Sequence, residues 1–268
     1  MPAVSGADHL LDDLLAQGKH AITTAEAAAY LGVPESHVRV RLHRLGQRGK
    51  VFSPARGLWV AVPPSFRSWG TLPGLQFIDA LMDHLGREYY VGWLSAAELH
   101  GAAHQRPQVL QVAVGTHTAD RDLGRVHLRF AQCRHIAALP RARHNTPTGQ
   151  AWVATPELTA LDLADVPRLG AGLNNVATVL GELANDGTFD ADALAQTAEH
   201  FPLPTQRRLG YLLEYVGAAE LADALHPLAE RRRAFPADLL ATRGGSGADA
   251  PVDKRWRLVV NTDVDPDL

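Results

Sequence analysis

The chain of 268 residues carries 26 lysines and arginines against 29 acidic residues, a formal net charge of −3, and 46% of its residues are hydrophobic. This length and apolar content are ample for a sizeable core and long for one compact domain, so we expect two domains. No stretch approaches the roughly 18 uninterrupted apolar residues of a membrane span, and no basic segment followed by an apolar run suggests export. The single cysteine, Cys133, excludes an internal disulfide and a cysteine-based zinc site. We therefore expect a soluble cytoplasmic protein without a membrane partner.

Basic residues are concentrated near the start of the chain. Residues 19–67 contain eight lysines and arginines and two acidic residues, a net charge of +6 within a protein of −3. A segment of this kind predicts binding to a polyanion.

Three helices are predicted in the first 50 residues. In "GADHLLDDLLAQGKH" leucines recur at helical spacing and a glycine supplies a natural stop. Thr23 followed three residues on by Glu26 is the capping-box pattern, so a second, alanine-rich helix should begin there. In "ESHVRVRLHRLGQRGK" the apolar residues Val38, Leu42 and Leu45 recur at i, i+4 and i+7. They predict a third helix with a narrow apolar stripe and a basic remainder.

The pattern then changes to that of a β-hairpin. "KVFSPARGLWVAVPP" predicts two short strands joined by a turn at residues 53–57, with Arg56 at its tip, and the double proline ends the unit. Helix, helix, turn, helix and hairpin in this order are the plan of a winged helix-turn-helix DNA-binding domain. We place this domain at residues 1–68.

Residues 69–268 predict a mixed α/β domain with a helical half, so the expected fold class is α+β. Strands are expected around residues 89–91 and in "VLQVAV", "RVHLRFAQC" and "QAWVAT". Ser95 with Glu98 predicts a capped helix after the first of these strands, and Thr155 with Pro156 predicts the start of another. From there the pattern is helical to about residue 233, and "RWRLVVN" is expected to form a last strand.

The third helix and the hairpin supply the candidate DNA-binding residues. At about 100° per residue, the face opposite the apolar stripe can enter the major groove, where an arginine can bond a guanine edge and a valine can contact a thymine methyl. The base-reading candidates are Ser36, His37, Val40 and Arg44. Arginines on the flanks and on the wing would meet the DNA backbone, and threonines at the start of the second helix could donate to a phosphate. The full set of DNA-binding candidates is Thr23, Thr24, Ser36, His37, Arg39, Val40, Arg41, His43, Arg44, Arg48 and Arg56.

Two other interpretations of the basic helix compete with DNA binding. A charged helix can be only a solvated face, and RNA is also a polyanion. The order of the elements and the scarcity of acidic residues favour a binding surface over a solvated face. A narrow helix with a two-stranded wing suits the major groove of B-form DNA better than the deep, narrow groove of A-form RNA.

No motif indicates catalysis. His100 and His104 have the i, i+4 spacing of metal ligands but lack the glutamate of HExxH. The late stretches "GGSGADAPVDKRW" and "TDVDPD" contain the Gly-Ser and Asp-x-Asp elements of nucleotidyltransferases, but in the wrong structural order. There is no Walker loop, no GxGxxG after a strand and no GxSxG elbow. We expect no catalytic residue, no metal and no cofactor, and therefore no enzyme.

The predicted winged helix, combined with four later blocks, makes the chain resemble the AbiEi family of bacterial antitoxins over nearly its whole length. The blocks are "EYYVGWLSAAELHGAAHQRPQVLQVAV", "VATPELTALDLAD", "QRRLGYLLEYVG" and "RWRLVVN". The resemblance implies an antitoxin of a type IV toxin–antitoxin or abortive-infection system. It also implies a repressor that binds inverted repeats near the promoter of its own operon. The implied partner is a nucleotidyltransferase-like toxin, which antitoxins of this family are described as counteracting without a stable complex.

Residues of this chain match the recurring blocks of the AbiEi family by position. Arg207 and Arg208 belong to the third block, where a basic, functional surface and the solvated start of a core helix are both open interpretations. The residues that match are Tyr90, Ser95, Glu98, His100, Gly101, Gln105, Thr155, Pro156, Asp162, Arg207, Arg208, Gly210 and Glu214.

The sequence therefore predicts a DNA-binding autorepressor and antitoxin. One winged helix buries too little DNA for tight operator binding, so two copies are expected on an inverted repeat, either as a dimer or through cooperation assisted by DNA bending. Two alternatives from other classes remain. One is a nucleic-acid-processing enzyme that its winged helix delivers to substrate, and the other is a transcriptional regulator whose C-terminal domain senses a ligand.

Overall fold

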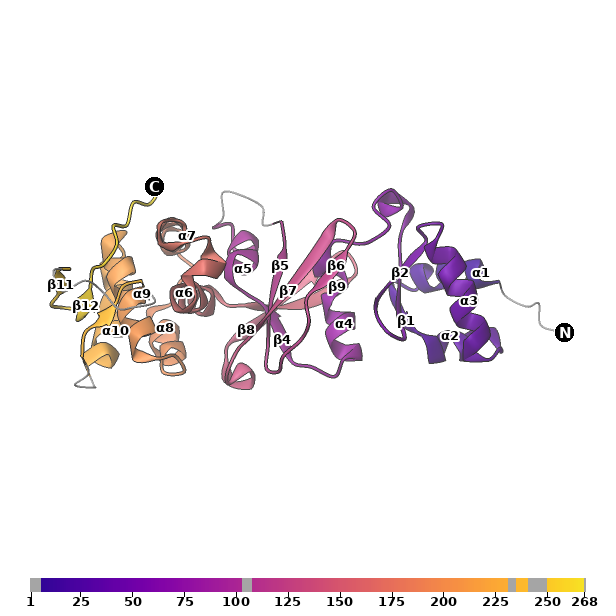
Figure 1. Cartoon of the computed structure of the whole chain (residues 1–268), viewed down its shortest axis with the longest axis horizontal. Helices are drawn as coiled ribbons and strands as arrows, with labels where there is room; N and C mark the ends of the chain where they lie inside the picture. Colours follow the sequence, from indigo (N-terminus) through magenta and orange to yellow (C-terminus); the bar gives the residue numbers. More distant parts are fainter. Residues whose placement is uncertain (1–5, 103–107, 231–234, 241–249, 268) are drawn as a thin grey trace. The chain divides into compact units, whose positions relative to one another are not determined.

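The computed structural model in Figure 1 describes residues 6–102, 108–230, 235–240 and 250–267. Helices and strands are mixed along the chain, which confirms the predicted α+β class. None of the helices in these ranges is long and apolar enough to cross a bilayer. The chain divides into two compact units. Unit 1 consists of Met1–Tyr90, Gln108–Ile136 and Arg143–Trp152, and unit 2 of Val91–Pro107, Ala137–Ala142 and Val153–Leu268.

The boundary expected after residue 68 does not coincide with the boundaries of these units. Unit 1 continues past residue 68 and includes most of a β-sheet that follows it. As a division of function, the boundary at residue 68 stays a prediction.

The beginning of unit 1 is built from helices packed on a small antiparallel sheet. Its elements are α1 (Ala7–Ala16), β1 (Ala21–Thr23), α2 (Thr24–Leu31), α3 (Glu35–Gly46), β2 (Val51–Ala55) and β3 (Leu58–Ala61). The predicted stripe of α3 is buried, with Val38 and Leu42 at 0% and Leu45 at 4% exposure. It packs in one cluster with leucines of α1 and with Val51 of β2. The predicted amphipathic face of α3 is therefore confirmed, and its basic face is left to solvent.

Strand β1 was not predicted. Its three residues are too few to show an alternating pattern, so the sequence gives no sign of a strand before α2. Ile22 is buried, and β1 pairs antiparallel with β3 from Ala21 opposite Val60 to Thr23 opposite Leu58. The predicted hairpin of β2 and β3 is confirmed, so the sheet has the order β1-β3-β2.

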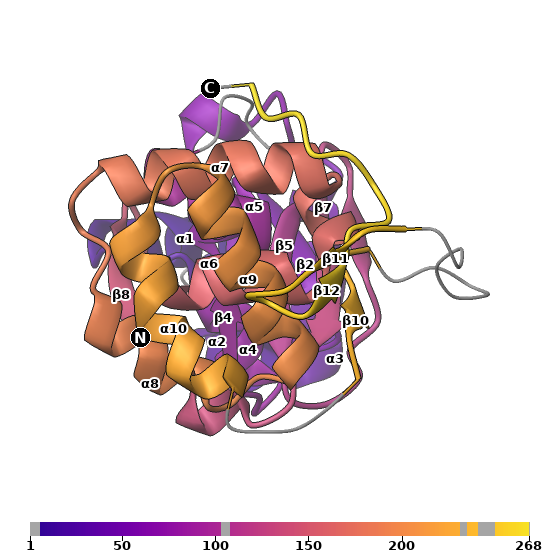
Figure 2. The same cartoon turned by 90° about the vertical axis from the view of Figure 1, so that its left-hand side faces the viewer.

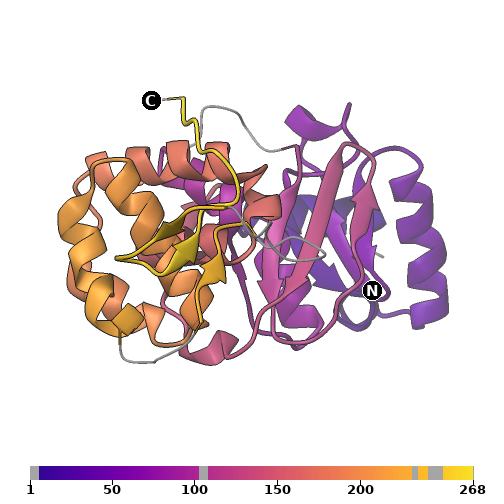
Figure 3. The same ribbon diagram turned by 60° about the vertical axis from the view of Figure 1, so that its left-hand side comes forward.

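The rest of unit 1 contains helix α4 (Ile78–His84) and most of a six-stranded sheet of order β6-β7-β5-β4-β9-β8, whose strands lie side by side in Figure 3. The strands are β4 (Tyr89–Val91), β5 (Leu110–Val114), β6 (Arg121–Leu123), β7 (Val126–Gln132), β8 (Arg141–Thr146) and β9 (Gly149–Ala154). Strand β5 runs parallel to β7, and β6 runs antiparallel to β7. The four strands expected from apolar patterns are confirmed. The edge strands β6 and β8 were missed because their polar sequences carry no apolar alternation.

Unit 2 is mainly helical, as Figure 2 shows. Its helices are α5 (Trp93–Leu99), α6 (Pro156–Asp165), α7 (Leu173–Asn185), α8 (Ala191–Ala198), α9 (Leu203–Tyr215) and α10 (Ala219–Glu230). Three short strands follow, namely β10 (Ala237–Asp238), β11 (Val252–Asp253) and β12 (Leu258–Val259), in the order β10-β12-β11. The strand expected in "RWRLVVN" is thus shorter than predicted and pairs with two neighbours that the sequence did not indicate.

The capping prediction for α5 is wrong, and that for α6 is confirmed. Helix α5 begins at Trp93 after Gly92, so Ser95 lies inside the helix and is buried instead of capping it. The buried strand β4 is followed directly by Gly92 and the start of α5, where Trp93 adopts a positive φ of 49°. Thr155 caps α6 by accepting a hydrogen bond from the backbone N–H of Leu158.

Helix α9 holds the end of the chain in place. The Arg208 guanidinium donates to the carbonyl of Leu239 next to β10, and the Glu214 carboxylate accepts a hydrogen bond of 2.6 Å from the indole N–H of Trp256. Gly210 makes room for the same indole, since a Cβ at this position would lie 2.1 Å from the nearest ring atom. In Figure 2 the C-terminal strands accordingly lie alongside α9. The residues that match the third block of the family resemblance therefore hold the C-terminal segment against α9.

Arg207 and Arg208 are buried and therefore form no basic surface. Their exposed fractions are 1% and 6%, and both guanidinium groups donate to backbone carbonyls. Both earlier interpretations, a functional basic surface and a solvated helix start, are wrong because later segments of the chain cover this end of α9. Most of the "ERRR" run lies outside the described residues.

Replacing Gly210 by alanine should destabilise unit 2. The added Cβ has no space beside the buried indole of Trp256, so we expect the free energy of unfolding to fall by about 3 kcal/mol, the upper end for overpacking. Urea denaturation followed by circular dichroism measures the change. In a Trp256→Ala background the ring is gone, and Gly210→Ala should then cost little, because alanine is the better helix former. An equal cost in both backgrounds would contradict the close packing of this pair.

Candidate nucleic-acid interface

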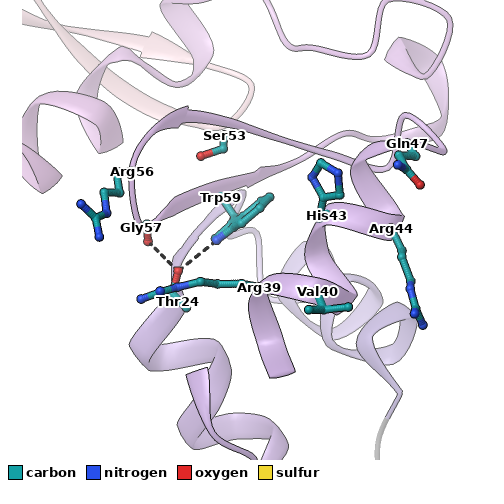
Figure 4. Close-up of a pocket in the computed structure, with 10 residues that line it drawn as sticks. All are labelled: Thr24, Arg39, Val40, His43, Arg44, Gln47, Ser53, Arg56, Gly57 and Trp59. Atoms are coloured by element: carbon teal, nitrogen blue, oxygen red, sulfur yellow. Dashed lines mark hydrogen bonds between the residues drawn. The ribbon is translucent and has the colours of Figure 1, made fainter. Parts of the chain in front are cut away.

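Helix α3 and the β2–β3 hairpin line an open groove of about 610 Å³ in unit 1 (Figure 4). Three arginines surround it, with Arg39 and Arg44 coming from α3 and Arg56 from the hairpin turn. The floor is partly apolar, because Val40 is 52% exposed there and the Trp59 ring projects from β3. The lining residues are Thr24, Arg39, Val40, His43, Arg44, Gln47, Ser53, Arg56, Gly57 and Trp59.

The groove brings together many of the predicted DNA-binding residues. Those that line it are Thr24, Arg39, Val40, His43, Arg44 and Arg56. The candidates outside its lining are Thr23, Ser36, His37, Arg41 and Arg48. Ser36 and His37 are exposed in the first turn of α3, at the end of the face that carries Val40. Arg41 lies on the flank turned away from the hairpin, since two residues of helix put it about 200° from Arg39.

The arginines of the groove differ in their partners. Arg39 forms an ion pair of 2.9 Å with Glu35, one turn earlier on the exposed face of α3. Across the described ranges, Arg44 and Arg56 have no ion-pair partner, and both are exposed. Two uncompensated guanidinium groups therefore face the groove from different elements, which suits a polyanionic ligand.

Thr23 and Thr24 are used inside the protein, against the expectation that they donate to a phosphate. The Thr24 hydroxyl donates to the carbonyl of Gly57 at 3.3 Å and accepts from the Trp59 indole N–H at 3.0 Å. The Thr23 hydroxyl donates to the Glu26 carboxylate at 2.8 Å and accepts from the Glu26 backbone N–H. The backbone N–H of Thr24 is also taken, by the carbonyl of Gly57 at 2.8 Å. A phosphate at the start of α2 would have to break these bonds, so both threonines serve the fold.

Trp59 is the functional candidate that the sequence analysis missed. The sequence predicts only that it belongs to a short strand, in which the structure shows Leu58 and Val60 to be buried. The signal was the alternation itself, because it turns the side chain between two buried positions to the opposite face of the small sheet. That face proves to be the wall of the groove.

The residues of the first two family blocks that the structure describes are buried, half-buried or hydrogen-bonded within the protein. Tyr90 is fully buried and its hydroxyl donates to the Cys133 sulfur at 3.4 Å. The Nε2 atom of His100 lies 2.8 Å from the carbonyl oxygen of Ala154. Ser95 and Asp162 are buried, Glu98 and Pro156 are half-buried, and Thr155 caps α6. Gln105 and His104 fall outside the described residues.

No metal site emerges in the ranges that the structure describes, where no group of three or more His, Cys, Asp or Glu side chains could share an ion. In the Asp-x-Asp element near the end of the chain, Asp263 and Asp265 are exposed, and the backbone N–H of Asp265 donates to the Asn174 side chain. The Gly-Ser element lies outside the described residues.

The capping box of α2 should make stability depend on pH. Hydrogen bonds from the backbone N–H and then the hydroxyl of Thr23 hold the pKa of Glu26 below its ordinary 4.5. Because the folded pKa is the lower one, this stabilisation is present above pH 4.5 and is lost as the pH falls through the folded pKa. Glu26→Gln should therefore lower the melting temperature near neutral pH, with a difference from the unsubstituted protein that narrows in acid. Thermal unfolding at several pH values checks this, with Glu220→Gln in the exposed first turn of α10 as the matched control.

Two comparisons with known proteins found matches, one to a family model and one to a solved structure. Residues 90–215 match the family model described as the AbiEi antitoxin C-terminal domain. Among solved structures, the crystal structure of the RV2827C protein from Mycobacterium tuberculosis is similar over 100% of this chain and 95% of its own, with a TM-score of 0.69 and 16% sequence identity. At this identity the similarity shows the fold alone. None of the curated proteins matches the chain.

Proposed function

We propose that this chain, whose residues 90–215 match the AbiEi antitoxin C-terminal domain, is an antitoxin of a toxin–antitoxin system and that it also represses its own operon by binding DNA. In this proposal residues 1–68 are a winged helix that recognises an operator. The rest of the chain counteracts a nucleotidyltransferase-like toxin. The two activities would then rest on different surfaces of one protein.

The observation that carries the DNA-binding proposal is the groove between α3 and the hairpin. Arg39, Arg44 and Arg56 line this groove around its partly apolar floor. Arg44 and Arg56 have no ion-pair partner in the described ranges. Helix α3 has 12 residues, about 18 Å of length along the groove, and an α-helix with its side chains is about 10–12 Å across, which fits a major groove about 12 Å wide. A segment of net charge +6 in a protein of −3 directs this side of the molecule to a polyanion.

The geometry suggests a division of roles among the groove residues. Arg44 follows Val40 by one helical turn on the exposed face, so the two could contact neighbouring base edges, a guanine and a thymine methyl respectively. Arg39 and Arg56 lie nearer the hairpin, where they could meet phosphates. A single such helix supplies little buried area, which favours two copies of the chain on an inverted repeat.

Removing the two groove arginines of α3 should weaken DNA binding and its dependence on salt. For Arg39→Ala with Arg44→Ala we expect roughly a 10- to 100-fold loss of affinity for the upstream region of the operon, and a salt slope smaller by about 1 to 2. Fluorescence anisotropy at two salt concentrations, against the upstream region and a scrambled duplex, measures both. Arg134→Ala with Arg168→Ala removes the same charge from exposed sites outside the groove and is the control. Unchanged affinity and slope in the groove variant would rule out this interface, and equal, weak binding of both duplexes would rule out an operator.

Toxin counteraction should survive the same substitutions. Arg39 and Arg44 precede the matched antitoxin domain, so their loss leaves residues 90–215 intact. We expect cells that produce the toxin of the same operon to be rescued equally well by the Arg39→Ala, Arg44→Ala variant and by the unsubstituted protein, while repression of a promoter reporter is lost. Loss of rescue by a variant that folds normally would show that the two roles depend on one surface.

A further inference from the structure

The turn of the β2–β3 hairpin is held by side chains from outside the hairpin. The backbone carbonyl of Arg56 lies 3.0 Å from the Nε2 atom of His84, the last residue of α4. The carbonyl of Pro54 accepts from Nε of Arg121 in β6 at 3.3 Å. The carbonyl of Gly57 accepts from both the backbone N–H and the hydroxyl of Thr24. The carbonyls of Arg56 and Gly57 in the turn and of Pro54 near the end of β2 are thus each bound by a different element of unit 1.

Packing adds to these hydrogen bonds. The ring of Phe52 in β2 meets the ring of Phe77 before α4 edge to face, with 5.0 Å between the centroids. The His84 ring lies against Gly57, where a Cβ would be 3.7 Å from its Cε1 atom. The turn therefore rests on α4 and its approach, which follow residue 68 in the chain.

This bracing acts on the residue that faces the groove from the hairpin. Arg56 is exposed and its guanidinium has no ion-pair partner in the described part of the chain, so its own charge does not fix its position. An exposed hairpin tip is ordinarily mobile, and ordering it on binding would cost conformational entropy. Bonds to the backbone of residues 54, 56 and 57 remove that freedom in advance, which is the general source of affinity through preorganisation.

We infer that His84 and Arg121 are positioning residues for DNA binding, which hold the hairpin turn so that Arg56 faces the groove. The inference rests on the proposed DNA-binding function and extends it beyond residues 1–68. Neither residue is among the groove residues, and neither was indicated by the sequence. The His84 ring donates to this carbonyl when Nε2 carries a proton.

The test uses the full chain and the DNA duplex from upstream of its operon, with affinity read by fluorescence anisotropy at two salt concentrations. His84→Ala frees the Arg56 carbonyl and should weaken binding about as much as Arg56→Ala, roughly five- to tenfold, with a salt slope smaller by about 1. His84→Gln keeps a side-chain N–H donor and should restore most of the affinity. The double variant His84→Ala, Arg56→Ala should bind no more weakly than Arg56→Ala alone, because both changes remove the same contact.

Two controls separate positioning from damage to the fold or loss of charge. His200→Ala removes an exposed histidine of unit 2 and should bind DNA like the unsubstituted protein. Arg121→Ala should behave like His84→Ala toward Arg56→Ala, whereas Arg168→Ala, which removes the same charge elsewhere, should not. If His84→Ala lowers the melting temperature enough to unfold the protein, Arg121→Ala and His84→Gln still report on the turn.

The outcomes distinguish the inference from the proposal beneath it. Additive losses in the double variant, or full affinity in both His84→Ala and Arg121→Ala while Arg56→Ala is weakened, would overturn the positioning role and leave DNA binding intact. Full affinity of Arg56→Ala itself would also overturn it, because the turn would then carry no contact. If the unsubstituted protein shows no preference for the upstream duplex, the proposed function fails first.

Discussion

The candidate interface depends on the hydrogen bonds of one buried hydroxyl. Thr24 is 4% exposed, and its Oγ1 atom donates to the Gly57 carbonyl and accepts from the Trp59 indole. These bonds connect the first residue of α2 to Gly57, just before β3, and to Trp59 within β3. Helix α2 leads through a tight turn into α3. The two walls of the groove are therefore fixed to one another at this junction. A buried hydroxyl with both of its roles satisfied is worth more as a fixed point than an exposed one, since breaking it would strand polar groups away from water.

The need to satisfy buried polar groups also explains how the C-terminal segment is held on α9. Arg208 lies 6% exposed in α9, and a buried guanidinium is tolerated only when its donors are satisfied. Backbone carbonyls of Ala164, Asp238 and Leu239 accept those hydrogen bonds. The residues of this chain that match the third family block thus hold the C-terminal segment on α9.

The uneven charge of the molecule is consistent with two roles for one chain. The +6 segment supplies the arginines around the groove, while the remainder of the chain is acidic. His84 and Arg121 contact backbone carbonyls of the β2–β3 hairpin. The part of unit 1 after residue 68 therefore holds the hairpin beside the candidate interface, and contacts between segments this far apart are not visible in a pattern of helices and strands.

The sequence alone determined the elements whose signal is local. The apolar stripe of α3, the capping box of Thr23 and Glu26 and the cap of α6 by Thr155 all follow from residues within one or two helical turns. Tertiary structure decided whatever depends on distant partners: the short and edge strands without an apolar pattern, the internal use of the Thr24 hydroxyl, and the burial of Arg207 and Arg208. Trp59 joined the groove for the same reason, because which face of a strand becomes a wall depends on the elements packed around it. Spacing along the chain fixes the direction of a side chain, whereas its partners are set by contacts between residues far apart in sequence.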